Sequence, residues 1–220
     1  MARRKPARAH EAVLNTEVPT IIEFLLDETG SMLDCKTATV AGYNDFLDEQ
    51  RKQSGTCLLT LTKFDTGGQK TPYVDLNIGM IPHMQEDWFI PGGGTNLRDT
   101  IGSRMAALKE RLATWTIKPN VLFVVMTDGG DNASRTYSED ATRAALKHHM
   151  EEGWTFVYLG ADQDALAVAE RLGFPAGNTK SFASAKMRET MQTLAKATTA
   201  YRAARAPAST ADTDFFNASR

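Results

Sequence analysis

The amino-acid sequence predicts an α/β domain whose central sheet is doubly wound and mostly parallel, with one antiparallel edge strand and helices on both faces. Short apolar runs alternate along the chain with longer segments of helical periodicity, which is typical of parallel sheets. The runs at 20–26 and 121–126 are nearly continuous in apolar residues, as strands covered on both faces require. An Asp-Thr-Gly-Gly turn at 65–68 separates two further strand-like segments and indicates a hairpin, which supplies the antiparallel pair.

The first half of the chain supplies three of the expected strands and one helix. The run Thr20–Leu26 has a single polar break and predicts the first strand. The following segment, 33–53, places Val40, Tyr43 and Leu47 at the spacings of a helix face. The second and third strands, joined by the hairpin, are expected at 57–64 and 73–78.

The second half supplies the clearest helix, at 97–112, and the most apolar strand, which we expect at the centre of the sheet. Ser138 can cap a helix that runs to residue 150, and Asp162 can cap a helix that ends before Gly173. The apolar stripe of the clearest helix is Leu97, Ile101, Met105, Leu108 and Leu112. The remaining expected elements are strands at 154–159 and 178–182 and a helix at 185–204, with Met187 and Met191 facing inward.

A chain of 220 residues fits one such domain with short tails. We expect the domain at 19–205, a flexible basic arm rather than a signal peptide at 1–18, and a flexible tail at 206–220. A formal net charge of −2 gives no global field toward nucleic acid or membranes, and the apolar runs are only of strand length. Cys35 and Cys57 form no disulfide framework, so the cytoplasm is the expected location.

Three loops at one edge of the predicted sheet offer hard oxygen ligands. Asp27, Thr29 and Ser31 follow the first strand, and alternate residues that leave a strand can converge on one point. Asp128 follows the most apolar strand, and Thr95 ends a glycine-rich loop before the clearest helix. Carboxylates and hydroxyls are ligands that Mg²⁺ prefers. The sequence therefore predicts one divalent metal held by these five residues, Mg²⁺ first, with Mn²⁺ or Ca²⁺ as alternatives.

Each of these loops also has a plain structural interpretation. Asp27 and Ser31 can cap the helix that follows them, and Asp128 with Gly129 can form an ordinary turn. The glycines at 92–94 are not a phosphate loop, because no Gly-Lys-Ser or Gly-Lys-Thr follows them. The convergence of three independent loops favours the metal site over these separate explanations.

The histidines are weaker candidates. His148 and His149 end a predicted helix, where histidine is favoured anyway, so we expect them on a solvated face. His10 falls in the arm and His83 in a loop, so the sequence shows no cluster of His and Cys ligands. Ser31 has no histidine linked to it by a motif, which a serine nucleophile would need.

The predicted metal ligands also resemble a known pattern. Asp-Glu-Thr-Gly-Ser at 27–31, Gly-Gly-Gly-Thr at 92–95 and Thr-Asp-Gly-Gly at 127–130 look like the metal-ion-dependent adhesion site of von Willebrand factor A (vWA) domains, written DxSxS…T…D. At Thr29 the family more often has Ser, but the hydroxyl is kept. The resemblance extends over about 19–182. The matching positions are Asp27, Thr29, Ser31, Thr95 and Asp128.

The resemblance implies a Rossmann-like sheet and a module that grips a partner protein through a metal-bridged acidic residue. The stretches GYNDFLDEQRK, TDGGDNASRTYS and EGWTFVYLGADQDA look like the stand-alone vWA proteins of bacteria and their phages, and a phage-encoded chain would act in the host cytoplasm.

An enzyme is not expected, because no residue clearly supplies the base that metal catalysis needs. Two rival hypotheses stay open. One is a Mg²⁺-dependent phosphohydrolase, although the haloacid-dehalogenase pattern DxD would want an acid where Thr29 stands. The other is a phage or structural interaction protein whose metal site is vestigial. Nucleic-acid binding is not expected, since the sequence has neither a basic face nor interleaved aromatics. The oligomeric state is not predicted.

Overall fold

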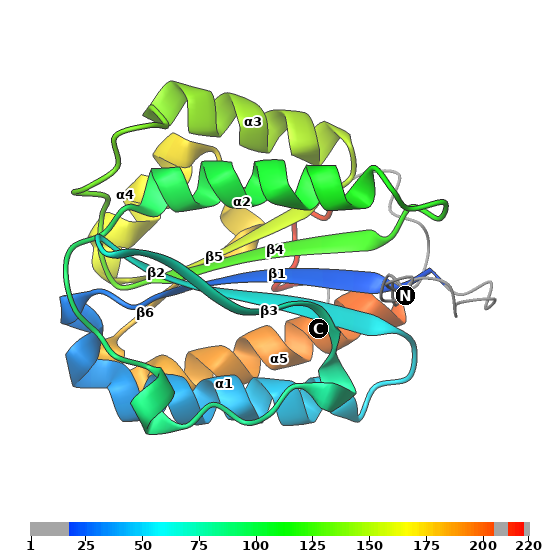
Figure 1. Cartoon of the computed structure of the whole chain (residues 1–220), viewed down its shortest axis with the longest axis horizontal. Coiled ribbons are helices and arrows are strands. Elements are labelled where there is room, and N and C mark those ends of the chain that lie inside the picture. Colours follow the sequence, from blue (N-terminus) through cyan, green and yellow to red (C-terminus); the bar gives the residue numbers. More distant parts are fainter. Residues whose placement is uncertain (1–17, 205–210, 218–220) are drawn as a thin grey trace, which may run out of the picture.

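The central sheet of the computed structural model has six strands in the order β3-β2-β1-β4-β5-β6 (Figure 1). The structure describes residues 18–204 and 211–217, apart from the side chains of 162–165. The strands are β1 (Thr20–Asp27), β2 (Cys57–Asp65), β3 (Gly68–Asn77), β4 (Asn120–Thr127), β5 (Thr155–Ala161) and β6 (Thr179–Phe182). Neighbouring strands pair in parallel except β2 and β3, which form the antiparallel hairpin. This topology confirms the predicted doubly wound sheet with one antiparallel edge strand.

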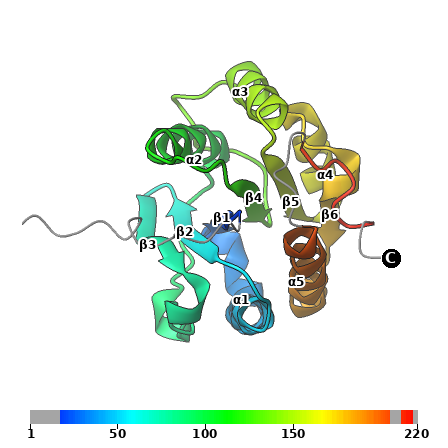
Figure 2. The ribbon, with the colours of Figure 1, turned by 90° about the vertical axis from the view of Figure 1, so that its right-hand side faces the viewer.

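Helices cover both faces of the sheet (Figure 2). The helices are α1 (Lys36–Arg51), α2 (Leu97–Leu112), α3 (Glu139–Glu151), α4 (Asp162–Leu172) and α5 (Met187–Ala203). Helices α1 and α5 pack together on one face, and α2, α3 and α4 cover the other. In β1, Phe24 and Leu26 belong to one core while Ile21 and Leu25 belong to the other. The continuous apolar run at 20–26 is therefore what a strand between two helical layers needs.

Local signals placed several helix ends correctly. Helix α2 has the predicted bounds 97–112, and Met105 of its stripe is buried. The Ser138 hydroxyl accepts a hydrogen bond from the Ala141 N–H at 3.1 Å and caps α3 as predicted. Gly173 ends α4 in the left-handed conformation, at φ 85°, which glycine adopts without strain. Within the described part of the chain, no helix is long and apolar enough to cross a membrane.

Two predicted helix starts are wrong by a few residues. A 3₁₀ turn at Gly30–Cys35 precedes α1, so the helix expected from residue 33 begins at Lys36. The N-cap of α4 is Ala161, and Asp162 is the first residue of the helix. The chain that leaves β1 needs these extra residues to turn back toward the sheet before a regular helix can begin.

Part of the expected C-terminal tail packs against the domain. Phe215 is 1% exposed, and its N–H donates to Asn178 Oδ1 at 2.9 Å. The Asp212 N–H donates to Thr155 Oγ1 at 3.0 Å, at the start of β5. These contacts fix residues 211–217 beside β5 and β6. The remaining parts of the expected arm and tail, 1–17, 205–210 and 218–220, lie outside the described residues.

The single polar break in β1 is a buried ion-pair network. Glu23 is fully buried, and its Oε1 accepts a hydrogen bond from Arg104 Nε at 2.8 Å. Its Oε2 accepts one from Arg111 Nη2 at 2.6 Å. Both arginines belong to α2, so the buried carboxylate ties this helix to the centre of the sheet.

Candidate metal centre

The predicted ligands lie where the order of the strands reverses. Strands β1 and β4 are adjacent and parallel at the centre of the sheet, and the chain then proceeds outward to opposite edges. Asp27 is the last residue of β1, and Asp128 directly follows β4. Open α/β sheets bind ligands outside the carboxyl ends of their strands at such a switch point. The fold therefore brings two carboxylates from distant parts of the sequence to one location.

Asp27 is the most deeply placed of the candidate ligands, with no exposed surface. Its Oδ1 accepts a hydrogen bond from the Thr29 N–H at 2.8 Å, and its Oδ2 accepts one from the Thr127 hydroxyl at 2.5 Å. Asp27 forms no ion pair with any described residue. The pKa of Asp27 is raised to about 6 overall: burial raises it, hydrogen bonds from Thr127 and Thr29 lower it, and the nearby charge of Asp128 adds a smaller increase.

The hydroxyls of the same loop link Asp27 to the second carboxylate. Thr29 Oγ1 lies 3.1 Å from Ser31 Oγ, and Ser31 Oγ donates to Asp128 Oδ1 at 2.7 Å. Thr29 is 1% exposed, whereas Ser31 lies at the surface. These oxygens extend from the buried Asp27 carboxylate to the surface. An ion bound to them would therefore be accessible to solvent from one side.

Thr95 is brought to the same edge by backbone contacts. Its N–H donates to Asn132 Oδ1 at 2.8 Å, and its carbonyl accepts from the N–H groups of Asn132 and Ala133 at 3.0 Å each. A Cβ on Gly129, the residue after Asp128, would lie 3.8 Å from Thr95 Oγ1. Thr95 is thus adjacent to the Asp128 loop. The other four predicted ligands are joined to one another by direct hydrogen bonds.

The glycine-rich loop that carries Thr95 fits closely against the loop after β1. The Gly92 N–H donates to the Glu28 carbonyl at 2.9 Å, and the Gly30 N–H donates to the Gly93 carbonyl at 3.2 Å. Gly93 has φ +68°, and a Cβ there would collide with the Thr66 hydroxyl. A side chain at this position would therefore be excluded both by the backbone conformation and by the close approach of the hairpin turn.

The loop after β4 is fixed to the start of α2 by two acids, Asp99 from the helix and Asp131 from the loop. Asp99 accepts hydrogen bonds from the N–H groups of Arg135, Thr136 and Tyr137 at 2.7–2.8 Å. Burial alone would raise the pKa of Asp99, but these three bonds outweigh it and lower the pKa. Asp131 in turn accepts from the Arg98 N–H at 2.7 Å. The loop that carries Asp128 is therefore held in place before any ligand binds.

Glu28, next to Asp27, serves a different purpose. Its Oε1 accepts from Lys63 Nζ at 2.7 Å and from the Ile90 N–H at 2.7 Å, and its Oε2 accepts from Lys70 Nζ at 3.0 Å. Burial alone would raise the pKa of Glu28, but these donors lower it. Glu28 is thus neutralised by the chain itself and ties β1 to the hairpin and to the segment before the glycine-rich loop.

The oxygen spacing is compatible with a magnesium ion. An octahedron with Mg–O distances of about 2.0–2.1 Å has neighbouring oxygens about 2.9 Å apart. The Thr29–Ser31 and Ser31–Asp128 oxygen pairs are separated by 3.1 and 2.7 Å. All the donors are hard oxygens, and the buried negative charge of Asp27 is not neutralised by a described residue. Hard oxygens at these separations are compatible with a divalent cation, and the same separations are ordinary for the hydrogen bonds that now join them.

Several residues of this site were not predicted from the sequence. Thr127 holds Asp27, Asn132 holds Thr95, and Asp99 holds the loop after β4. Lys63 neutralises Glu28, and a lysine within an otherwise buried strand was a signal that could have pointed to such a partner. The roles of the others depend on contacts between segments that the sequence does not pair.

The chain has the fold of vWA domains. A von Willebrand factor type A protein from Catenulispora acidiphila matches with a TM-score of 0.54 and 13% identity, over 81% of this chain and 42% of that one. The pilus adhesin SpaC from Lactobacillus rhamnosus GG matches with a TM-score of 0.64 and 15% identity, over 85% and 31%. Manganese-loaded TRAP from Plasmodium vivax matches with a TM-score of 0.53 and 12% identity, over 78% and 71%.

These likenesses concern the fold alone, because the sequence identities are low. The chain spans less than half the length of the first two of these structures, 42% and 31%. No protein-family model and no curated protein matches the sequence. The fold-level resemblance to vWA domains is confirmed.

Proposed function

We propose that this chain is a metal-dependent protein-binding module in which Asp27, Thr29, Ser31, Thr95 and Asp128 hold one Mg²⁺. The observation that carries the proposal is Asp27. Its carboxylate is fully buried beside that of Asp128, and its described partners are neutral. Burying an ionised carboxylate is costly unless a cation compensates it. A divalent ion from solution supplies that compensation.

Each proposed ligand contributes in its own way. Asp27 and Asp128 supply the negative charge, and Thr127 orients Asp27 by donating to Oδ2. The hydroxyls of Thr29 and Ser31, now hydrogen-bonded in a chain, would turn their lone pairs toward the cation. When bound, Mg²⁺ would offer an open position at the surface, where a partner's carboxylate replaces water.

An apolar rim beside these loops supports a protein as the partner. Leu33, two residues after Ser31, is 62% exposed, and Ile90, whose N–H binds Glu28, is 63% exposed. Exposed apolar residues around a polar centre are what a protein interface uses, since they exclude water around the decisive contact. We therefore propose a partner that presents an Asp or Glu within an apolar surface.

We propose that the module has no catalytic activity and works in the cytoplasm of a bacterium or of a phage-infected host. Ser31 donates to Asp128, and the described side chains that contact Asp27 are threonines, so no histidine or lysine is placed to move a proton there. An assay with a generic phosphate ester checks this. Turnover that Asp128→Ala abolishes would favour the phosphohydrolase hypothesis instead.

The metal is tested by titration of tag-free protein with Mg²⁺ and Mn²⁺ in a calorimeter. We expect one site per chain, which is lost when Asp27→Ala and Asp128→Ala are combined. Asp34→Ala is the matched control, because Asp34 is an exposed acid on the turn that follows Ser31. Binding that survives the double substitution would show that the ion sits elsewhere.

The partner is tested by affinity capture in Mg²⁺ and in EDTA, followed by mass spectrometry. A partner that depends on Mg²⁺ and is lost with Asp27→Ala is then purified, and its acidic residues are changed one by one to the matching amide. We expect one such change to remove most of the affinity. Capture that persists in EDTA and with Asp27→Ala would contradict the metal-bridge hypothesis.

A further inference from the structure

A second group of potential metal ligands lies at the other end of the sheet. His148, His149 and Glu152 occupy the end of α3, which leads into the amino end of β5. The candidate metal centre lies at the carboxyl ends of β1 and β4. The two locations share no residue, so a role for the second group is independent of the proposed function.

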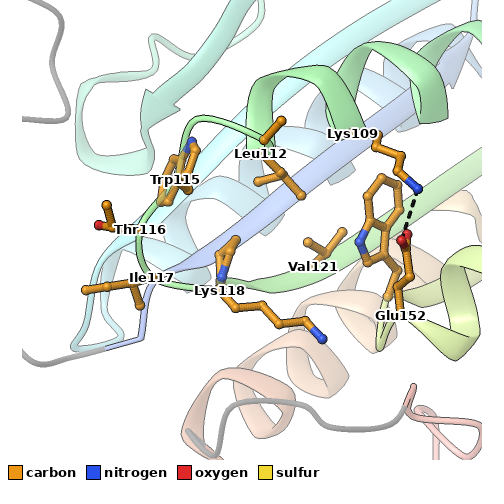
Figure 3. A pocket seen from close by; sticks show the side chains of 11 residues that line it. Lys109, Leu112, Trp115, Thr116, Ile117, Lys118, Val121 and Glu152 are labelled. Carbon is orange, nitrogen blue, oxygen red and sulfur yellow. Dashed lines mark hydrogen bonds and ion pairs between the residues drawn. The ribbon is translucent and has the colours of Figure 1, made fainter.

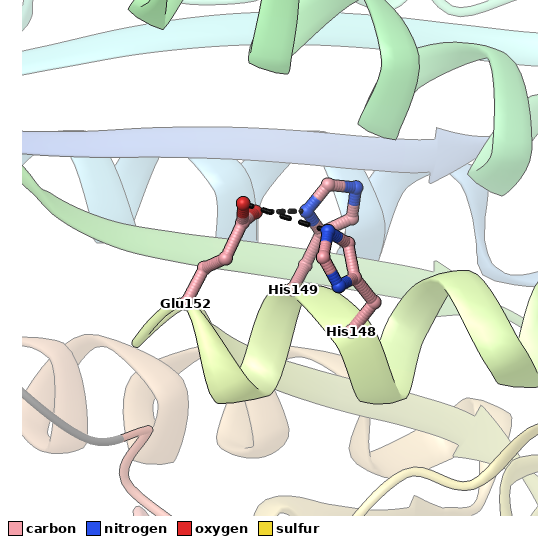
Figure 4. Close-up of side chains that lie close together, drawn as sticks. All are labelled: His148, His149 and Glu152. Carbon is pink, nitrogen blue, oxygen red and sulfur yellow. Dashed lines mark hydrogen bonds and ion pairs between the residues drawn. The ribbon is translucent and has the colours of Figure 1, made fainter.

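The three side chains point toward one another (Figure 4). One ligand atom from each lies within 4.8 Å of the others. His149 Nδ1 is 2.7 Å from Glu152 Oε2, and His148 Nε2 is 3.5 Å from Glu152 Oε1. Neighbouring ligands of a tetrahedral Zn²⁺ with bonds of about 2.0–2.1 Å lie about 3.3 Å apart. The two separations lie on either side of this spacing, and the exposed side chains of His148 and Glu152 can move to adjust them.

The sequence prediction of a solvated histidine pair is correct for His148 and wrong for His149. The side chain of His148 is 58% exposed, whereas that of His149 is 6% exposed. The His149 ring stacks on Trp154, with centroids 4.1 Å apart and an angle of 10° between the planes. This stacking fixes the imidazole that faces Glu152, which is the preorganisation that a metal ligand needs.

A cation already lies among these atoms. Lys109 Nζ is 3.2 Å from His148 Nε2 and 3.0 Å from Glu152 Oε1. An ammonium group has donors only, so at this contact the His148 nitrogen presents its lone pair, which is the electron pair that a metal would take. Lys109 is half exposed on a flexible stem, so it can move out when a more strongly bound cation arrives.

Glu152 of the cluster also lines an open groove (Figure 3). The groove has a volume of about 430 Å³, and Lys109, Glu152 and Trp154 contribute to its wall. An incoming ion and its water molecules can therefore reach the carboxylate from the side where Lys109 now lies.

We propose that His148, His149 and Glu152 form a binding site for Zn²⁺ or a similar transition metal, with Lys109 as its competitor. Two imidazoles and one carboxylate suit Zn²⁺, Ni²⁺ and Cu²⁺ rather than Mg²⁺. Three protein ligands leave a fourth position for water. Glu152 is the C-cap of α3 and follows His149 by three residues and His148 by four, so all three ligands come from one helix end and the site needs no folding step.

Equilibrium binding of Zn²⁺ to tag-free protein tests the site. The background carries Asp27→Ala and Asp128→Ala, and Mg²⁺ is present in large excess, so that the first centre does not contribute. We expect one Zn²⁺ per chain. His148→Ala and Glu152→Gln should each weaken binding about tenfold or more, since even loss of an outer-shell partner costs about 10–100-fold.

The sharpest variant is Lys109→Met, which removes the competing ammonium. Its charge lies next to the ion's position, so its removal should strengthen Zn²⁺ binding about tenfold. Zn²⁺ should also raise the melting temperature of the background protein but not of its His148→Ala derivative. His83→Ala changes an exposed histidine outside the cluster and should leave binding unchanged. Zn²⁺ binding that is absent, that survives His148→Ala, or that Lys109→Met fails to strengthen would overturn the proposal.

Discussion

Asp27 and Glu28 are neighbours in the sequence, and both are fully buried, yet their charges have different partners. Glu28 accepts hydrogen bonds from two lysines and a backbone N–H, which together lower its pKa. Among the described residues, the partners of Asp27 are the neutral groups of Thr29 and Thr127, and burial leaves its pKa raised to about 6. One acid is neutralised within the fold, and the other is not.

The difference distinguishes a carboxylate that serves the fold from one that is a candidate metal ligand. Both side chains incur the cost of leaving water, which is several kcal/mol for an ionised group. Glu28 recovers it through Lys63 and Lys70, so it needs nothing from solution. Asp27 is held in position without a counter-charge, which leaves that charge for a cation. Four changes test this contrast, from the largest expected effect to the smallest.

Lys63→Met should have the largest effect on stability. Lys63 is nearly buried and lies 2.7 Å from Glu28, so its loss leaves a buried carboxylate with one remaining, half-exposed lysine. Breaking a buried pair in this way costs about 3–5 kcal/mol. Urea unfolding in the presence of EDTA measures the loss. A change below about 1 kcal/mol, the range of surface pairs, would mean that Glu28 does not depend on Lys63.

Asp27→Asn should act in the opposite direction and stabilise the metal-free protein. The amide keeps an oxygen for the Thr29 N–H and removes the buried charge next to Asp128. A pKa of about 6 in the fold, against 3.8 for an ordinary Asp, corresponds to at most about 3 kcal/mol at neutral pH. The same change should abolish Mg²⁺ binding. If Asp27→Asn lowered the melting temperature in EDTA, the proposed difference between Asp27 and Glu28 would be wrong.

The stability gained by Asp27→Asn should increase with pH. Below pH 4 the folded and unfolded wild-type chains both carry a protonated Asp27, so the two proteins should differ little. Between pH 4 and about 6 only the unfolded chain loses this proton, and wild-type stability falls relative to the variant. Above pH 6 the difference should be constant. Melting curves of both proteins across this range, in EDTA, check the profile.

The sequence predicted elements whose information is local. The stripe of α2 repeats at helical spacing, so its bounds were correct, and the apolar run of β1 required a strand between two layers. Asp27 and Asp128 were expected to meet because each directly follows a central strand, and parallel strands end at one edge. Topology therefore located the two candidate carboxylates, whereas the three hydroxyls were found from the loop motifs.

What the sequence did not predict depends on contacts between distant segments. Thr127 lies one hundred positions from Asp27, and nothing near it distinguishes its hydroxyl from an ordinary strand threonine. His149 follows an exposed histidine, and only the position of Trp154 in the fold shows that its ring is buried. Most helices and strands could therefore be predicted from the sequence, whereas the partners of the charged and polar side chains required the structure.

Thr127→Val should have an intermediate effect. It removes the hydroxyl that donates to Asp27 Oδ2 and accepts from the Gly129 N–H at 3.1 Å. Unsatisfied buried groups cost about 1–3 kcal/mol each, and we expect about 2 kcal/mol here. Mg²⁺ affinity should fall about 10–100-fold, as for loss of an outer-shell partner. Thr62→Val is the control, because it also loses a buried hydroxyl bond but should leave Mg²⁺ affinity unchanged.

Lys70→Met should have the smallest effect, although Lys70 also binds Glu28. Its side chain is 57% exposed, and its Nζ lies 3.0 Å from Glu28 and 3.9 Å from Asp65. Water can replace such an ammonium, and exposed pairs contribute about 0–1 kcal/mol. Since Lys63 still neutralises Glu28, urea unfolding should detect a loss of about 0.5 kcal/mol and no change in Mg²⁺ affinity. A loss as large as that of Lys63→Met would mean that Glu28 needs both lysines, and that exposure does not separate the two pairs.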